Sequence, residues 1–213
     1  MKRVAVVALL ALALAGCAVP GQSLSPGTAY AYDGAEVSNA SIDATYNAWL
    51  QETQGAVLPN RLQVMTLDAV REPAIALAIE SVDGAEELFT AERAELVATQ
   101  WFAFKQIGTE PSPAVIRSAQ GAYAVFVLAY NDADGSLMRE LADQVEAAVD
   151  GSPRSGEFDA DAFLNSVYAA MEAAQGEGID PAVSFIAFHN LNGFVTPPNP
   201  ARVKAPAPGE ATG

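Results

Sequence analysis

The sequence predicts a mainly α fold, a compact helical domain with short N- and C-terminal strands that are candidates for pairing across it. Three observations lead to this prediction. Apolar residues recur at helical spacing through most of the chain, residues that cap or stop helices separate these segments, and Ala114–Tyr130 is apolar on nearly every side. A helix of that last kind occupies the centre of a bundle or lines a sizeable interface. We therefore expect residues 29–195 to form one helical domain.

The N-terminus combines a basic start, an apolar run and a cysteine. Two basic residues precede Val4–Ala15, which is uniformly apolar but too short to cross a bilayer comfortably as a permanent helix. The residues Leu14-Ala15-Gly16-Cys17 resemble the lipobox of bacterial lipoproteins, in which the thiol takes a diacylglycerol and the signal is cut before the cysteine. The resemblance implies a signal peptide over residues 1–16 and a lipid on Cys17 that holds the protein at the extracytoplasmic face of the cell membrane. An ordinary export signal cut near Ala18 is the alternative.

Acidic side chains far outnumber basic ones. The 213 residues include 11 Lys and Arg and 26 Asp and Glu, a formal net charge of −15. Cleavage before Cys17 removes 16 residues and two basic side chains, which leaves 197 residues with 9 basic and 26 acidic side chains, a net charge of −17. The basic residues are scattered singly, so we expect no nucleic-acid partner and no charge-driven adhesion to anionic lipid. Cys17 is the only cysteine, so packing must stabilise the exported domain without an internal disulfide.

The domain is expected to begin with a strand followed by a capped helix. Residues 17–28 contain Pro, Gly and Ser without periodicity and predict a flexible tether. Ala29–Tyr32 predicts a short strand. Ser38 is placed to cap a helix that ends near Gly55, and the apolar face of this helix includes Trp49.

The segment from Asp33 to Asp43 resembles the opening of the SurA N-terminal-domain family of extracytoplasmic chaperones. In that opening a glycine is followed, after two variable positions, by an aliphatic residue and a serine, and then, after three more variable positions, by an aliphatic-acidic pair. The resemblance implies a helical domain that binds unfolded exported polypeptides, and many such proteins of actinobacteria are lipoproteins of about this size. A strand-turn-helix of any mixed fold is the structural alternative. The matching positions are Gly34, Val37, Ser38, Ile42 and Asp43.

Three further helical segments are expected in the middle of the chain. Between residues 58 and 82, Pro73 should kink or divide one long element because proline deletes a helical hydrogen bond. Another helix should begin near Thr90, and Pro111-Ser112-Pro113 should open the long apolar one. A membrane span is a competing interpretation of the apolar helix, but its fully apolar part, Gly121–Tyr130, is about half of the ~20 residues that a span requires.

The polar run Asn131–Ser136 should separate the apolar helix from the next one. Its Asp-x-Asp-Gly pattern occurs in metal loops. An EF-hand aligned on Gly135 would, however, make Tyr130 the first ligand and Leu141 the last, and neither can supply a carboxylate. We therefore predict a polar turn without a metal, followed by an amphipathic helix that ends before Gly151.

A second segment, Ser152–Asp159, is similar to the Pro-Arg-aromatic-Gly-x-aromatic-Asp segment that often closes the domain in the actinobacterial SurA-like lipoproteins. It departs from that pattern at Ser155, where an aromatic residue is usual. A turn into a helix capped by Asp159 is the structural interpretation, and the two are compatible. The matching positions are Pro153, Arg154, Gly156, Phe158 and Asp159.

The chain continues beyond the reach of this resemblance. A helical face is expected to end near Gly176. Ala182–Phe188 is rich in Val, Phe and Ile and predicts a strand, a candidate partner for Ala29–Tyr32. Residues 196–213 predict a disordered or extended Pro-rich tail.

Residues that carry chemistry are few. A Ser-His-Asp arrangement would need the only histidine, His189, which we expect to be capped or exposed at a strand end. The sequence has no nucleophile elbow, Gly-rich phosphate loop or zinc ligand set. The carboxylate pairs Glu86-Glu87 and Asp159-x-Asp161 lie where helix N-termini favour negative charge. We therefore expect no enzymatic activity, no cofactor and no metal.

The leading hypothesis is a lipid-anchored, chaperone-like protein that holds unfolded or partly folded exported polypeptides in an apolar groove between helices. Two alternatives remain open: a prolyl isomerase-related enzyme, although no parvulin-like stretch is found, and a non-catalytic scaffold lipoprotein of the envelope. The residues expected to contact a bound polypeptide are Trp49, Trp101, Phe104, Tyr123 and Phe126.

Overall fold

The structure is a computed structural model that describes residues 24–54, 59–152, 154–176 and 181–195. The described chain is mainly helical, which confirms the predicted fold class. The predicted signal peptide, Cys17 and the tail over residues 196–213 lie outside the described residues. In chain order the elements are β1 (Thr28–Tyr32), β2 (Ala35–Ser38), α1 (Asn39–Glu52), α2 (Arg61–Ser81), the 3₁₀-helix η1 (Ala85–Phe89), α3 (Ala91–Phe104), α4 (Pro113–Asn131), α5 (Ser136–Ala148), β3 (Val149–Gly151), β4 (Glu157–Phe158), α6 (Ala160–Gly176), the 3₁₀-helix η2 (Pro181–Asn190) and β5 (Phe194–Val195).

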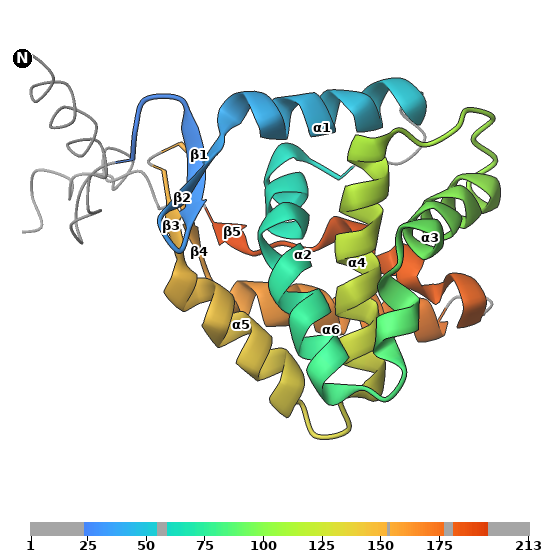
Figure 1. Cartoon of the computed structure of the whole chain (residues 1–213). Helices are drawn as coiled ribbons and strands as arrows, with labels where there is room; N and C mark the ends of the chain where they lie inside the picture. Colours follow the sequence, from blue (N-terminus) through green and yellow to red (C-terminus); the bar gives the residue numbers. More distant parts are fainter. Residues whose placement is uncertain (1–23, 55–58, 153, 177–180, 196–213) are drawn as a thin grey trace, which may run out of the picture.

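Helix α4 is the centre of the domain, as its apolar sequence predicts. It contacts α1, α2, α3 and η2, and Figure 1 shows it standing between α2 and α3 with α1 across its end. Its Ala122 and Leu128 are fully buried. At Gly121 it lies so close to α2 that a Cβ atom there would be 2.6 Å from the carbonyl oxygen of Leu67. In the described part of the chain, no helix has both the length and the apolar character that crossing a bilayer requires.

The sequence predicts that Pro73 kinks or divides the element between residues 58 and 82. Helix α2 runs as one helix of 21 residues through Pro73, so the proline does not divide it. Proline removes one helical hydrogen bond and costs about 3 kcal/mol in a helix interior. The residues around it, Val70 and Ala74, are fully buried, as are others along the helix. Packing of this face against the core offsets the lost hydrogen bond, because tertiary burial supplies most of the stability of helices in proteins.

Strand β1 is the middle strand of a three-stranded antiparallel sheet in the order β2-β1-β3. Tyr30 pairs with Val37 on one side and with Gly151 on the other. Asp33 and Gly34 form the tight turn between β1 and β2, and both have positive φ angles, 47° and 79°. The predicted strand is therefore confirmed, but its partners are β2 and β3.

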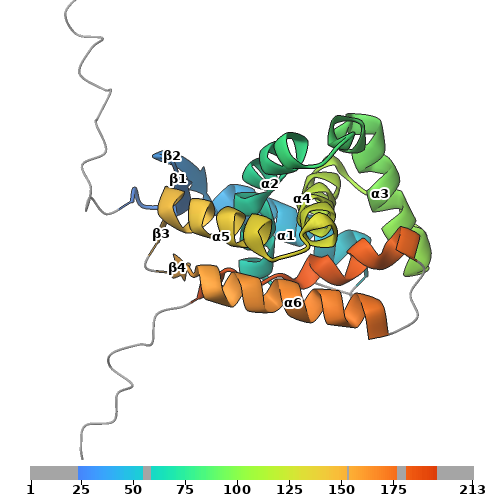
Figure 2. The same cartoon turned by 90° about the horizontal axis from the view of Figure 1, so that it is seen from below.

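The predicted strand over Ala182–Phe188 is wrong, and with it the predicted pairing to Ala29–Tyr32. This segment belongs to η2, which lies beside α6 (Figure 2) and also contacts α4. In a 3₁₀-helix, residues three apart lie on the same side, so Phe185 and Phe188 both enter the core. The C-terminal strand is instead the two-residue β5, which pairs with β4.

The predicted helix starts are confirmed by their caps. The hydroxyl groups of Ser38, Thr90 and Ser112 accept hydrogen bonds from backbone N–H groups in the first turns of α1, α3 and α4. Asp159 does the same for α6, with its Oδ1 atom 2.7 Å from the nitrogen of Ala162. The helices therefore begin where short polar side chains can replace missing helical hydrogen bonds.

Candidate functional site

Ring contacts form one continuous aromatic cluster that runs through the core to the surface. Trp49 of α1 meets Trp101 of α3 edge to face, with ring centroids 4.7 Å apart. Trp101 stacks on His189 of η2 at 4.8 Å. The contacts pass through Phe185 to Tyr123 of α4, whose ring stacks on Phe126 at 6.1 Å. The sequence-predicted binding residues that belong to this cluster are Trp49, Trp101, Tyr123 and Phe126.

The inner end of the aromatic cluster is closed. Trp49 and Trp101 expose none of their surface. Their indole Nε1 atoms are also buried and have no hydrogen-bond partner among the described residues. In this structure the two tryptophans therefore build the core and offer no surface to a polypeptide.

His189 is fully buried, so the expectation of a capped or exposed histidine at a strand end is wrong. Its Nδ1 atom lies 3.0 Å from the carbonyl oxygen of Ile186, and Nδ1–H must donate because a carbonyl can only accept. The pKa of the imidazole is lowered to about 4, chiefly by burial; the hydrogen bond to Ile186 opposes this shift, and the positive charge of Lys105 adds to it. The ring is therefore neutral at pH 7 and acts as one more aromatic side chain of the core.

Phe104 is separate from the aromatic cluster. It lies at the end of α3 with 44% of its surface exposed, and the Nζ atom of Lys105 is 5.4 Å from its ring centroid. The structure thus divides the predicted residues into two buried tryptophans, two residues at or near the surface end of the cluster, and one detached phenylalanine.

The outer end of the aromatic cluster opens into a surface groove between α4, α6 and η2, which we call the aromatic groove. Tyr130 forms one wall with 75% of its surface exposed, and its ring centroid lies 5.7 Å from that of Phe126. Phe126 also contacts Phe188 of η2 at 5.5 Å. The groove encloses about 330 Å³, counted with the space open to solvent. Its lining residues are Phe126, Tyr130, Met171, Ala174, Gln175, Ser184 and Phe188.

Of the groove residues, sequence reasoning named only Phe126. Tyr130 carried a signal, because it is the last residue of an apolar helix before the polar Asn131–Ser136 turn and so stands at a boundary with solvent. Nothing in the sequence around Met171 and Phe188 indicated that they would line a groove. They come from α6 and η2, and their position beside α4 depends on contacts between segments more than 40 residues apart.

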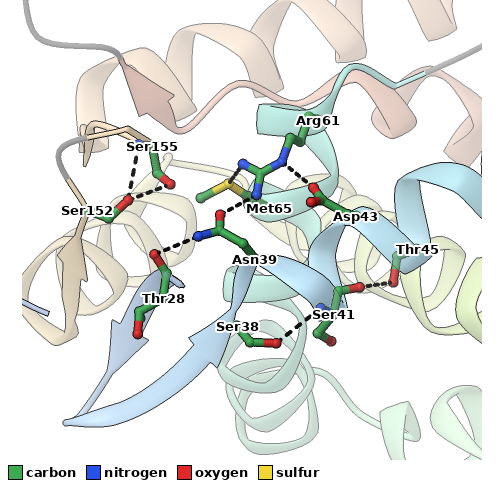
Figure 3. A network of polar contacts seen from close by, with 10 residues as sticks. All are labelled: Thr28, Ser38, Asn39, Ser41, Asp43, Thr45, Arg61, Met65, Ser152 and Ser155. Carbon is green, nitrogen blue, oxygen red and sulfur yellow. Dashed lines mark hydrogen bonds and ion pairs between the residues drawn. The ribbon is translucent and has the colours of Figure 1, made fainter. Parts of the chain in front are cut away.

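Asp43, one of the matching positions of the first resemblance, belongs to a polar network that joins the start of α1 to α2 and β1 (Figure 3). Arg61 of α2 donates to Asp43, with Nε 2.6 Å from Oδ1, and to the amide oxygen of Asn39. Asn39 in turn donates to the carbonyl oxygen of Thr28 at 3.0 Å. Ser38 caps the helix. Two matching residues therefore have structural roles in this fold: Asp43 holds the start of α1 to α2, and Ser38 caps α1.

The second resembling segment forms a tight turn between β3 and β4. Ser155 is fully buried, and its hydroxyl lies 2.9 Å from that of Ser152 (Figure 3). An aromatic side chain at position 155 would have no room beside this hydrogen bond. Phe158 packs on Phe163 at 5.6 Å, next to the capping Asp159. Pro153 lies outside the described residues.

The two carboxylate pairs noted in the sequence lie at the starts of helices or in ion pairs. Glu86 and Glu87 lie in the first turn of η1. Asp159 caps α6, and Asp161 lies 3.0 Å from a guanidinium nitrogen of Arg139. Among the described residues, no three His, Cys, Asp or Glu side chains gather so as to hold a metal ion.

No protein-family model, no curated protein and no solved structure matches the chain. The SurA resemblance therefore rests on the two sequence segments alone. The aromatic groove is one concave surface of the described domain where aromatic and apolar side chains meet solvent. A second lies beside β1, β2 and α2 and includes Tyr30, Tyr32 and Val37 in its lining.

Proposed function

We propose that the protein is a lipid-anchored, extracytoplasmic binding protein that holds apolar segments of unfolded or partly folded exported polypeptides in the aromatic groove. The observation that carries this proposal is the exposure of Tyr130 beside Phe126, Met171 and Phe188 in a concave surface. Aromatic and apolar side chains that gather in one concave surface are typical of binding sites, because burying them in a complex is favourable.

The chemistry of the groove suits binding. Its lining is aromatic and apolar except for Gln175 and Ser184, and most of its exposed surface is apolar. Covering this surface with an apolar side chain removes it from water, which favours binding. An extended polypeptide could place one apolar side chain between Tyr130 and Met171 without a specific sequence around it. Loose requirements of this kind fit a chaperone-like holder of many clients.

Light scattering of a chemically denatured exported client tests the binding proposal. The mature protein in phosphatidylcholine nanodiscs should slow aggregation, and Tyr130→Ser should weaken this protection about tenfold because an exposed anchor is lost. Leu96→Ser is a matched control, since Leu96 on α3 is 43% exposed and lies outside the groove. No protection at any ratio of protein to client refutes the proposal, and equal losses in the two variants refute the assignment to the groove.

Mass spectrometry of the native N-terminal peptide tests the anchor independently. The lipobox-like Leu14-Ala15-Gly16-Cys17 predicts a mature chain that starts at Cys17 with a diacylglycerol on its thiol. An unmodified Cys17, or a cut at another position, removes the membrane tether from the proposal; the binding assay is then carried out without nanodiscs, because the groove itself needs no lipid.

A further inference from the structure

Carboxylates lie on the turn between α4 and α5, which directly follows Tyr130; we call this turn, together with Tyr168 and Glu172 of α6, the rim of the aromatic groove. Asp134 Oδ1 accepts the backbone N–H of Ser136 at 3.0 Å, and this hydrogen bonding lowers the pKa of Asp134. Asp132 Oδ2 accepts the N–H of Met138 at 2.8 Å. The second oxygen of Asp132 is buried and has no hydrogen-bond partner among the described residues. The sequence pattern that resembles a metal loop therefore presents negative charge directly after Tyr130.

Helix α6 continues the same rim. The hydroxyl of Tyr168 lies against the turn, 3.6 Å from the position that a Cβ atom on Gly135 would take. Tyr168 is 49% exposed. Met171 and the exposed Glu172 follow it by three and four residues, so they share its side of the helix. The rim thus passes from Asp134 over a tyrosine ring to Glu172 beside the groove.

Among the residues that the structure describes, no unpaired positive charge is found at this rim. None of the groove residues is basic. Arg139, the first basic residue after the turn, already lies 3.6 Å from a carboxylate oxygen of Asp143 and 3.0 Å from one of Asp161. The chain as a whole carries a net charge of −15, so its field attracts cations toward such a surface.

We infer that the aromatic groove selects extended segments in which an apolar side chain is followed within a few residues by lysine or arginine. The inference rests on the proposed function and names the class of client. The apolar side chain enters between Tyr130 and Met171, while the cation lies over the Tyr168 ring and between the carboxylates of Asp134 and Glu172. Aromatic faces and carboxylates both attract a cation, and arginine also stacks on rings.

Charge complementarity favours this occupant over two others. A second copy of the chain would bring the same acidic rim against itself, and like charges facing each other oppose association. An anionic lipid surface would be repelled for the same reason. A cationic segment of another polypeptide neutralises the rim as it binds.

Fluorescence anisotropy with three labelled peptides tests the selection, with the mature protein in phosphatidylcholine nanodiscs. The peptides share the core Phe-Leu-Phe and are flanked by lysine, glutamine or glutamate. The lysine peptide should bind about three- to tenfold more tightly than the glutamine peptide, and the glutamate peptide more weakly, because exposed ion pairs contribute modestly. Raising the salt concentration should narrow these differences.

Charge-neutralising variants locate the effect. Asp134→Asn with Glu172→Gln should remove most of the preference for lysine and leave the affinity for the glutamine peptide unchanged. Glu86→Gln with Glu87→Gln removes the same charge from η1, which does not line the groove, and should leave the preference intact. Equal effects of the two double variants would assign the preference to net charge and overturn the inference.

The remaining outcomes separate this inference from the proposed function. Binding of all three peptides with equal affinity overturns the selection of cationic segments and leaves a general apolar groove. If no peptide binds and the protein does not slow aggregation of a client, both the proposed function and the selection of cationic segments are refuted. A dimer that dissociates on Tyr130→Ser substitution, measured by light scattering, would identify a second copy as the occupant and overturn the inference.

Discussion

Replacing His189 by phenylalanine should change how the free energy of unfolding depends on pH. The imidazole is buried between Trp101, which stacks on it at 4.8 Å, and Trp49, which meets it edge-on at 5.5 Å. Its Nδ1–H donates to a backbone carbonyl, while Nε2 has no hydrogen-bond partner among the described residues. Protonation of Nε2 would place an unpaired charge in the core, which is why burial lowers the pKa of His189 to about 4.

The magnitude follows from the difference between the folded and unfolded states. The pKa falls from 6.5 to about 4 on folding, and each pKa unit corresponds to about 1.4 kcal/mol, so the full effect is about 3 kcal/mol. Because the folded pKa is the lower one, the unfolded state binds the proton first as the pH falls. The contribution of the neutral, buried His189 to the free energy of unfolding is therefore fully present above pH 6.5. It is lost progressively as the pH falls toward 4.

Urea unfolding at pH 7.5 and pH 4.5, followed by tryptophan fluorescence, measures this effect. Both tryptophans of the chain lie next to His189, so they report on the relevant core. The chain has no other histidine. Subtracting the pH dependence of His189→Phe from that of the wild type therefore cancels the effect of carboxylate titration on the free energy of unfolding.

The wild type should lose more stability than the variant between the two pH values. His189→Gln, which cannot titrate, serves as a second variant if phenylalanine packs poorly. Parallel pH dependences of wild type and both variants would refute the buried neutral histidine.

Two further predictions concern packing and a buried hydroxyl. Gly121→Ala should cost about 1–3 kcal/mol in thermal unfolding, because its Cβ would lie 2.6 Å from the backbone oxygen of Leu67, which has little freedom to move. Gly108→Ala is the control and should be neutral, since no atom lies within 4 Å of a Cβ there. Thr66→Val should cost about 1–3 kcal/mol, because Oγ1 accepts the buried N–H of Gly193 at 2.9 Å and valine would leave that group unpaired. A neutral Thr66→Val would show that water replaces the hydroxyl.

The helix starts could be predicted from sequence because their signals are local. Ser38, Ser112 and Asp159 cap helices by bonding to N–H groups three residues away, which requires no knowledge of the rest of the fold. The failure at Ala182–Phe188 has the opposite cause. Its Val, Phe and Ile content suits a strand, and only contacts with α4 and α6 favour the 3₁₀-helix η2.

The candidate site shows the same limit. Tryptophan side chains prefer apolar surroundings, and both a protein core and a binding groove provide them. Residue type alone therefore does not tell which of the two a tryptophan occupies. Trp49 and Trp101 are buried in the core, where His189 of η2 packs against both rings. Phe126 lies two turns further along α4 than Ala119, where it contacts Phe188 of η2 but stays partly exposed in the groove. Whether an aromatic residue lies in the core or in the groove therefore depends on the position of η2, a segment that we predicted as a strand.

The central position of β1 has a mechanical consequence for a protein held at its N-terminus. β1 is hydrogen-bonded along both edges, to β2 and to β3, and the residue before it is held as well, because the carbonyl oxygen of Gly27 accepts the N–H of Asn39 at 2.7 Å. In an antiparallel sheet these bonds lie perpendicular to the strand, so a pull along β1 loads several of them at once. If the proposed lipid anchor holds the chain at Cys17, a pull on the anchor would therefore load the hydrogen bonds of β1 in shear.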